Sequence, residues 1–303
     1  ASGENKFRAG SDIDAKGMQR AAERVETDFE MMDFLAEPIQ GGLNQDQIKR
    51  MGMEQWRDIF TPRQLVVTYE YLEAFREFKL DIQKEHTDEK AETILTLLTF
   101  AATRTVQDNT RLVPWFDNRG FGNDMFRDNN FALKKMAGEN NLSAPRKGYL
   151  HTMDRIIEKY EELVEASSGG GDVEVFPGDA ATLTNKIEKE SIDISVVDPP
   201  YYSSIMYAEL SDIFYVVQKA YLRDIFPSLF DTKLTDKESE AVANPSLFDG
   251  IASDEQSQKE LADDYYEEKM EDIFSEQYKL LSPNGVMTVM FTHREMDAWD
   301  TLT

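Results

Sequence analysis

Residues 191–211 read SIDISVVDPPYYSSIMYAELS, and this stretch decides the fold of the second half of the chain. It opens with an apolar, β-branched run, Ile192–Val197, that is typical of a buried strand. Two prolines follow Asp198, and because proline cannot donate a hydrogen bond to a sheet, the strand must end there. Open α/β sheets bind their ligands at the carboxyl ends of strands. We therefore expect Asp198, Pro199 and Tyr201 to place a carboxylate, a stiff carbonyl and an aromatic ring at a ligand-binding edge.

The tetrad Asp198-Pro199-Pro200-Tyr201 resembles the signature of the S-adenosylmethionine-dependent amino-methyltransferases of nucleic acids. The resemblance continues through residues 202–212 and includes two distant segments, Trp56–Leu65 and Phe291-Thr292-His293. Together these segments are similar to one family, the large prokaryotic DNA methylases of adenine specificity. The tetrad alone is a moderately specific signal, and its flanks and the two segments strengthen it.

The resemblance implies a DNA methyltransferase that moves a methyl group from S-adenosylmethionine to N6 of adenine. Asp198 and the Pro199 carbonyl would each accept one N–H of the amino group, with Pro200 stiffening the tip. Orientation and charge placement would then supply most of the rate. The substrate would be double-stranded DNA with its target base flipped out, Tyr201 stacking on the base and Tyr202 contacting the nucleic acid. Aspartate at the first position favours adenine N6 over cytosine N4.

Asp179 lies in a Gly-Asp-Ala sequence after a predicted strand, Val173–Phe176. In the resembled family an acid at this place lies beside the adenine of the cofactor. A plain Asx turn or helix N-cap explains the same residue equally well. No spacing of His, Asp and Glu requires a metal site.

The glycine-rich loop that receives the methionine part of the cofactor has no counterpart in the sequence. Gly169–Gly171 follow a predicted helix rather than a strand, so they cannot take its place. The sequence also ends soon after a predicted strand at Val286–Phe291. We therefore expect an internal fragment, inactive by itself, of an enzyme that is active at full length.

The chain is strongly acidic, with 33 basic against 58 acidic residues and a net charge of −25. Such a charge ordinarily argues against nucleic-acid binding. The acids are spread along the chain, which favours adaptation to high salt, where charge repulsion is screened. Cysteine is absent, so disulfides and thiolate chemistry are excluded. No apolar run of membrane-spanning length and no signal peptide is visible, which predicts a cytoplasmic protein without membrane contact.

Periodicity and breakers predict an α/β fold in two regions. Residues 1–166 are expected to be mostly helical, and residues 172–303 to form an incomplete, Rossmann-like methyltransferase core with an acidic surface insertion at 228–258. The linker between them is Ser167–Gly171. The predicted helices span residues 14–35, 62–78, 88–105, 149–166, 208–222 and 261–281.

Residues 104–151 reverse the charge of the chain, with eight basic residues against five acidic ones. Aromatic residues are interleaved with these charges, which suits a loop that grips phosphates and stacks bases. An irregular connector whose aromatics fill the core explains the segment equally well. Under the first interpretation, the residues that contact DNA are Lys134, Lys135, Arg146 and Lys147.

Two other functions fit the same residues. One is a non-catalytic DNA-binding or assembly module that keeps the tetrad as part of its fold. The other is an amino-methyltransferase acting on cytosine N4 or on glutamine side chains of proteins. Partner proteins of a restriction or defence system are compatible with each interpretation, and the sequence does not identify the recognition site.

Overall fold

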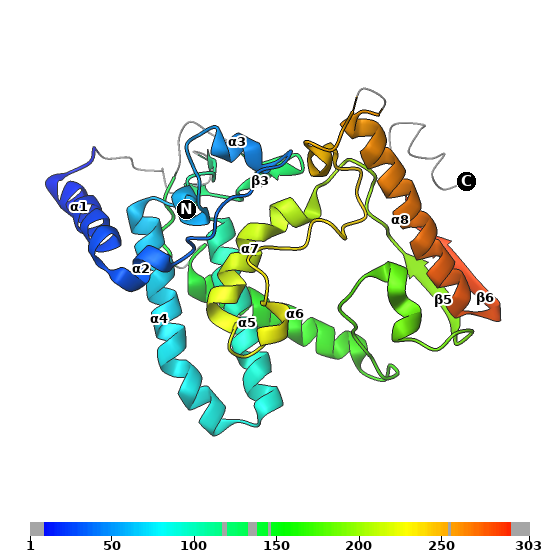
Figure 1. Ribbon diagram of the computed structural model, residues 1–303. Helices are drawn as coiled ribbons and strands as arrows, with labels where there is room; N and C mark the ends of the chain where they lie inside the picture. The colour runs from blue at the N-terminus through cyan, green and yellow to red at the C-terminus, as the bar shows by residue number, and fades with distance from the viewer. Residues whose placement is uncertain (1–8, 117–119, 133–137, 145–146, 254–255, 292–303) are drawn as a thin grey trace. The chain divides into compact units, whose positions relative to one another are not determined.

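The computed structural model describes residues 9–116, 120–132, 138–144, 147–253 and 256–291 (Figure 1). The chain folds into two units, each made of two segments. The first unit contains Ala1–Gly169 and Leu210–Thr235, and the second contains Gly170–Glu209 and Asp236–Thr303. The chain leaves the first unit within the Ser167–Gly171 linker and returns to it inside a helix.

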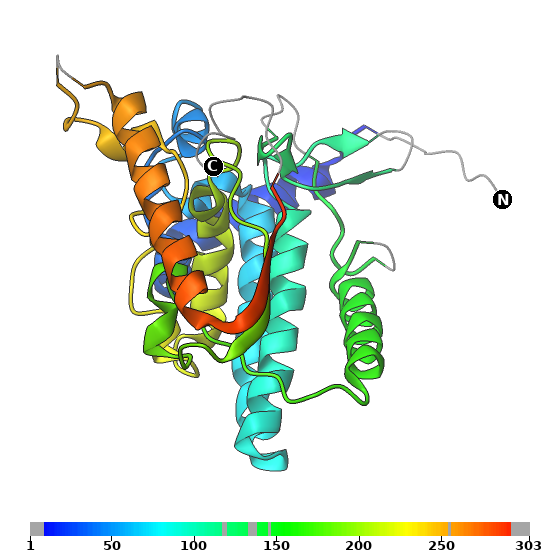
Figure 2. The same ribbon diagram turned by 90° about the vertical axis from the view of Figure 1, so that its right-hand side faces the viewer.

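The first unit is helical. Its longest helices, α4 (Pro62–Glu85) and α5 (Asp88–Gln107), run side by side in both views (Figures 1 and 2). Thr61 caps α4 by accepting a hydrogen bond from the Gln64 N–H, and Pro62 occupies the first turn. The other helical segments of this unit are α1 (Asp12–Thr27), α2 (Phe29–Asp33), α3 (Gln45–Lys49), η1 (Trp56–Ile59), α6 (Tyr149–Ser167) and η3 (Pro227–Leu229).

The core of the first unit includes residues from the returning segment. Helix α7 (Tyr207–Leu222) contributes the buried side chains of Ile213, Val216 and Val217. Phe230 and Leu234 are buried in the same core. The prediction of a surface insertion from residue 228 is therefore wrong in its first part, because this stretch supplies core side chains.

Two short antiparallel hairpins lie within the basic and aromatic segment of the first unit. Strand β1 (Trp115–Phe116) pairs with β2 (Phe121–Gly122), and β3 (Phe126–Arg127) pairs with β4 (Asn130–Phe131). The Phe131 ring is buried, and the Phe126 ring lies edge-on to Phe214 of α7 at 5.6 Å. Part of the aromatic content of this segment therefore fills the core, as the connector interpretation expects.

The second unit holds one parallel strand pair. Strand β5 (Ile192–Val197) pairs with β6 (Leu281–Val289), with Val197 opposite Val289 and a register shift between Ile192 and Ile194. A Cβ at Gly285 would lie 2.8 Å from the Ile192 carbonyl oxygen, so glycine permits the close approach at this irregularity. The remaining helical segments are η2 (Ala180–Asn185), η4 (Pro245–Phe248) and α8 (Gln258–Leu280).

Helix α8 packs on the strand pair and on the chain that follows it. Ser195 of β5 donates a hydrogen bond to Gln277 of α8 at 2.7 Å, and both side chains are buried. Tyr266 and Met270 of α8 form a small core with Tyr202 and Ala243. Val242, Ala243 and Asn244 are buried, so a short stretch of the predicted 228–258 surface insertion is internal, whereas residues 249–253 are exposed.

The described residues are thus mixed helix and strand, and each sheet among them has only two strands. The expected Rossmann-like sheet is not present in this part of the chain. Residues 173–176 do not form the predicted strand, and Val173 and Val175 are exposed. The predicted helices are confirmed, except that residues 14–35 divide at Asp28, whose side chain caps α2. No described helix is long and apolar enough to cross a membrane.

Candidate functional site

The Asp198-Pro199-Pro200 tip leaves the carboxyl end of β5 and is tied to α8. The Pro200 carbonyl oxygen accepts a hydrogen bond from the Tyr266 hydroxyl at 2.9 Å and another from the Tyr202 N–H at 3.0 Å. Because the prolines have fixed φ angles, these two hydrogen bonds leave the tip little freedom. The strand and the helix therefore hold Asp198 in place at the end of the sheet.

Tyr202 turns the chain at the tip by adopting a left-handed conformation, with φ of +52°. This region is uncommon for a bulky residue and persists only where surrounding contacts enforce it. The Tyr202 hydroxyl donates a hydrogen bond to Asp263, and the ring lies edge-on to Tyr266 at 5.2 Å. Only 5% of Tyr202 is exposed. Tyr202 therefore packs within the second unit, and its predicted contact with nucleic acid stays a prediction.

Tyr201 points back towards the carboxylate that begins the tetrad. Its hydroxyl donates a hydrogen bond to Asp198 Oδ1 at 2.7 Å, and this hydrogen bond raises the pKa of the Tyr201 phenol. The edge of Phe291 faces the Tyr201 ring at 6.0 Å. Within the described residues, Asp198 Oδ2 and the Pro199 carbonyl oxygen accept no hydrogen bond. Two acceptors thus remain free at the tip.

A cleft of about 270 Å³ opens at the tip, between Asp198, both prolines, Tyr201 and Tyr207. Burial raises the pKa of Tyr207, and the nearby Asp198 and Glu240 carboxylates raise it further. Glu240 accepts a hydrogen bond from the Ala208 N–H at the start of α7, and burial raises the pKa of this carboxyl group. The cleft therefore combines aromatic walls with acidic groups.

Asp179 caps η2 and forms an ion pair. Its Oδ1 accepts a hydrogen bond from the Ala181 N–H at 2.9 Å, and its Oδ2 lies 2.5 Å from Lys269 Nζ of α8. Burial raises the pKa of Asp179, but the hydrogen bonds from Lys269 and Ala181 outweigh it, so the net pKa is lowered. The N-cap interpretation describes this geometry, and a cofactor hydroxyl would have to compete with Lys269.

Lys147 is the one predicted DNA contact of the basic segment that lies among the described residues. Its ammonium group forms an ion pair with Asp108 at 2.9 Å, donates a hydrogen bond to Asn123 and lies over the Phe121 ring. The side chain is therefore engaged in holding the segment together. Lys134, Lys135 and Arg146 lie outside the described residues, as do Thr292 and His293.

Sequence reasoning missed three residues that shape the site: Tyr207, Glu240 and Tyr266. Tyr207 lies within residues 202–212, which resemble the methylase family, so its position in that stretch could have identified it. The sequence gives no such signal for Glu240 and Tyr266, because both approach the tip from distant parts of the chain. No group of three His, Asp or Glu side chains in the described part of the chain could hold a metal ion.

Comparison with protein-family models, curated proteins and solved structures found no match to this chain.

Proposed function

We propose that the protein is a DNA methyltransferase that transfers a methyl group from S-adenosylmethionine to N6 of adenine. The observation that carries the proposal is the pair of unoccupied acceptors at the tip, Asp198 Oδ2 and the Pro199 carbonyl oxygen, beside the Tyr201 ring. An exocyclic amino group has two N–H donors, and these acceptors match them in number and kind.

The proposed chemistry follows from these acceptors. The lone pair of an exocyclic amino group is delocalised into the ring, which makes the nitrogen a poor nucleophile. Two hydrogen bonds to Asp198 and Pro199 would orient the group and favour the positive charge that develops on it. S-adenosylmethionine would supply the methyl group when bound.

The size of the cleft also supports a flat substrate. At about 270 Å³ it lies just below the range of about 300–1,000 Å³ that is usual for drug-sized ligands, which suits a single planar base. Tyr201 and Tyr207 both line it, so a flipped base would find an aromatic surface on entering.

A non-catalytic DNA-binding or assembly module is the second candidate, and Asp179 is the observation that favours it. Both oxygens of the Asp179 carboxylate are already used, one by Ala181 and one by Lys269. The sequence has no glycine-rich loop to receive the cofactor. In this second candidate the tip therefore serves only to stabilise the fold. The two candidates differ in whether methyl transfer occurs.

The test is methyl transfer from labelled S-adenosylmethionine to DNA at high salt, using the full-length protein because the sequence lacks the glycine-rich loop. Asp198→Ala should lower the rate by about 10²–10³-fold, as removal of a preorganised polar group does. Asp193→Ala is the matched control, since Asp193 is an exposed carboxylate on the same strand. Undiminished transfer by Asp198→Ala would contradict the proposal. Methylated protein with unmodified DNA would instead support a glutamine methyltransferase.

A further inference from the structure

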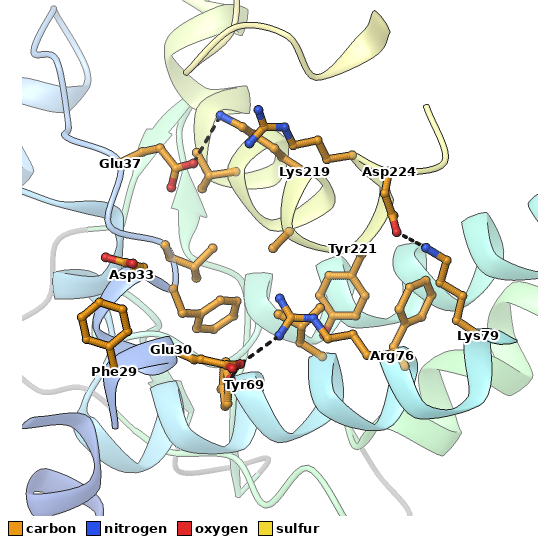
Figure 3. A pocket seen from close by; sticks show the side chains of 17 residues that line it. Phe29, Glu30, Asp33, Glu37, Tyr69, Arg76, Lys79, Lys219, Tyr221 and Asp224 are labelled. Carbon is orange, nitrogen blue, oxygen red and sulfur yellow. Dashed lines mark hydrogen bonds and ion pairs between the residues drawn. The ribbon is translucent and has the colours of Figure 1, made fainter. Parts of the chain in front are cut away.

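A second cavity, of about 660 Å³, lies wholly within the first unit (Figure 3). Helices α2, α4 and α7 and the chain following α2 form its walls. It is formed by residues other than those of the Asp198 tip. Its volume is in the range usual for small-molecule sites.

The floor of this α2–α4–α7 cavity is apolar and aromatic. The Phe34 ring meets Tyr69 edge-on at 5.3 Å, and the Phe75 ring meets Tyr221 in the same way at 5.0 Å. At one side lies Phe29, whose side chain is 78% exposed although it borders the cavity (Figure 3). An exposed ring next to such a floor is an available surface for a flat apolar group.

Charged side chains surround the floor, and two of the basic ones, Lys79 and Lys219, lie deeper than their acidic partners. Lys79 is 14% exposed while its partner Asp224 is 70% exposed. Lys219 is 12% exposed and its partner Glu37 is 24% exposed, the two lying 3.4 Å apart. Arg76 is 49% exposed and pairs with two acids, Glu73, which is 44% exposed, and Glu30, which is 69% exposed. The Lys79 and Lys219 side chains are therefore the ones that lie deeper than their acidic partners.

A fourth basic side chain, Arg223, also lines the cavity and is exposed. It forms no ion pair with any described residue. Four basic and four acidic residues line the cavity, so its lining is neutral in a chain whose net charge is −25. Asp224 is 70% exposed, so water competes for its carboxylate and its ion pair with Lys79 adds little to stability. Exposed acids are also the partners that an incoming anion can most easily replace.

We propose that the α2–α4–α7 cavity binds a small organic anion with a flat aromatic body. The anionic group interacts with Lys219 and Arg223, which lie one helical turn apart, and the ring lies on the apolar floor against Phe29. This site is independent of the methyl transfer proposed above, because none of these residues belongs to the Asp198 cleft.

The test is calorimetric titration of the 303-residue chain with 2-naphthalenesulfonate, 2-naphthalenesulfonamide and sulfate. The first probe has the ring and the charge, the second has the ring alone, and the third has the charge alone. We expect one site for 2-naphthalenesulfonate and at least about tenfold weaker binding of the other two, because a hydrogen bond to a charged group is worth about a factor of ten or more.

Variants then locate the site. Arg223→Glu should weaken 2-naphthalenesulfonate binding by about tenfold. Phe29→Ala should weaken it by about three- to tenfold through loss of the aromatic contact. Both residues are exposed, so neither substitution should prevent folding. The controls are Arg50→Glu and Phe100→Ala, which make the same changes at exposed positions of the first unit outside the cavity.

Three outcomes would overturn the proposal. One is the absence of binding at any soluble concentration of 2-naphthalenesulfonate. Another is equal affinity for the sulfonamide, or equal effects of Arg223→Glu and Arg50→Glu. The third is a dimer in sedimentation experiments that Phe29→Ala dissociates and that binds no probe, which would assign the cavity to a second copy of the chain.

Discussion

At the scale of single residues, the hydrogen bond between Tyr201 and Asp198 links the two side chains that the proposed function uses most. Because the Tyr201 hydroxyl holds Oδ1, the other carboxylate oxygen is directed by a neighbour that is itself part of the tip. The same hydrogen bond keeps the hydroxyl end of the Tyr201 ring beside Asp198. This one hydrogen bond thus positions both the Asp198 acceptor and the Tyr201 ring that would stack on the base.

Substitutions at Tyr201 should separate these two effects. Tyr201→Phe removes only the hydrogen bond, worth about 0.5–1.5 kcal/mol, so methyl transfer should fall by about two- to tenfold. Tyr201→Ala also removes a stacking surface worth about 1–3 kcal/mol and should cost about another tenfold or more. The measurement is the initial rate of transfer to DNA by the full-length protein. Tyr278→Phe on the exposed face of α8 is the control, and equal rates for Tyr201→Ala and wild type would exclude stacking by this ring.

Glu276 is the residue whose titration should be visible in the stability of the second unit. Hydrogen bonds from the Thr184 side chain, from Lys279 and from the Thr184 N–H lower its pKa to about 2. In an unfolded chain the pKa of glutamate is about 4.3. The carboxylate therefore stabilises the fold fully above about pH 4.3, and this contribution is lost as the pH falls towards 2.

Glu276→Gln should consequently destabilise the protein at neutral pH, and the difference from wild type should shrink as the pH falls from about 4.3 towards 2. Urea denaturation at a series of pH values would measure it. Glu271→Gln, on the same helix but exposed, should show no such convergence. A difference that stays constant over this range would mean that Glu276 does not titrate with folding.

How far the site could be predicted differs between neighbouring residues. The position of Asp198 at the end of a strand follows from the two prolines alone. The burial of Tyr202 could not be predicted, because it depends on the left-handed conformation of this residue and on the distant partners Asp263 and Tyr266. The ion pair of Lys147 could not be predicted for a similar reason, since its partner Asp108 lies across the segment.

At the scale of elements, α4 shows a helix start that the sequence encodes completely. Thr61 and Gln64 form a capping box, and the Thr61 hydroxyl also donates a hydrogen bond to Glu139 at 2.6 Å. Thr87 precedes α5 in the same way but makes no capping hydrogen bond through its side chain. The two threonines form a natural matched pair.

Thr61→Ala should lower the free energy of unfolding of the first unit by about 1–2 kcal/mol, the upper part of the range for loss of an N-cap. Thr87→Ala should lower the same free energy by only a few tenths of a kcal/mol, as is usual where no capping hydrogen bond is lost. Urea denaturation followed by tryptophan fluorescence compares them, because Trp56 is buried in this unit. Equal destabilisation by both variants would show that the capping box has no net effect.

Helices were predicted better than strands for a physical reason. A helix such as α5 forms its hydrogen bonds within one segment, so periodicity and end signals suffice to find it. A strand needs a partner, and β5 finds one only in β6, far along the chain. Residues 173–176 have the composition of a strand but no partner among the described residues, and they remain without regular structure. The buried stretch Val242–Asn244 was missed because its polar flanks resemble a loop.

At the scale of the whole molecule, the net charge of −25 should make stability depend on salt. The Debye length falls from about 10 Å at 0.1 M to about 3 Å at 1 M, so repulsion between the acids is progressively screened. We expect the Tm to rise with KCl and to level off near 1 M. Each 1 kcal/mol of relieved repulsion corresponds to about 2–4 °C.

Scanning calorimetry in KCl and in sucrose of equal osmolality would test this expectation. Sucrose stabilises proteins by exclusion from their surface and not by screening, so its effect should continue without levelling off. A Tm that is unchanged or lower in KCl would contradict the adaptation to high salt that the composition indicates.

Helix α7 has a consequence for how the protein is synthesised. The first unit buries Ile213, Val216, Val217, Phe230 and Leu234, all of which follow the first segment of the second unit along the chain. A ribosome that has released residues 1–169 has therefore not released a complete core. Domains normally fold in order as they emerge, but here the first must wait until residue 235 has left the exit tunnel. Until then part of its apolar surface has no partner, so we expect the nascent chain to need protection from aggregation over this stretch.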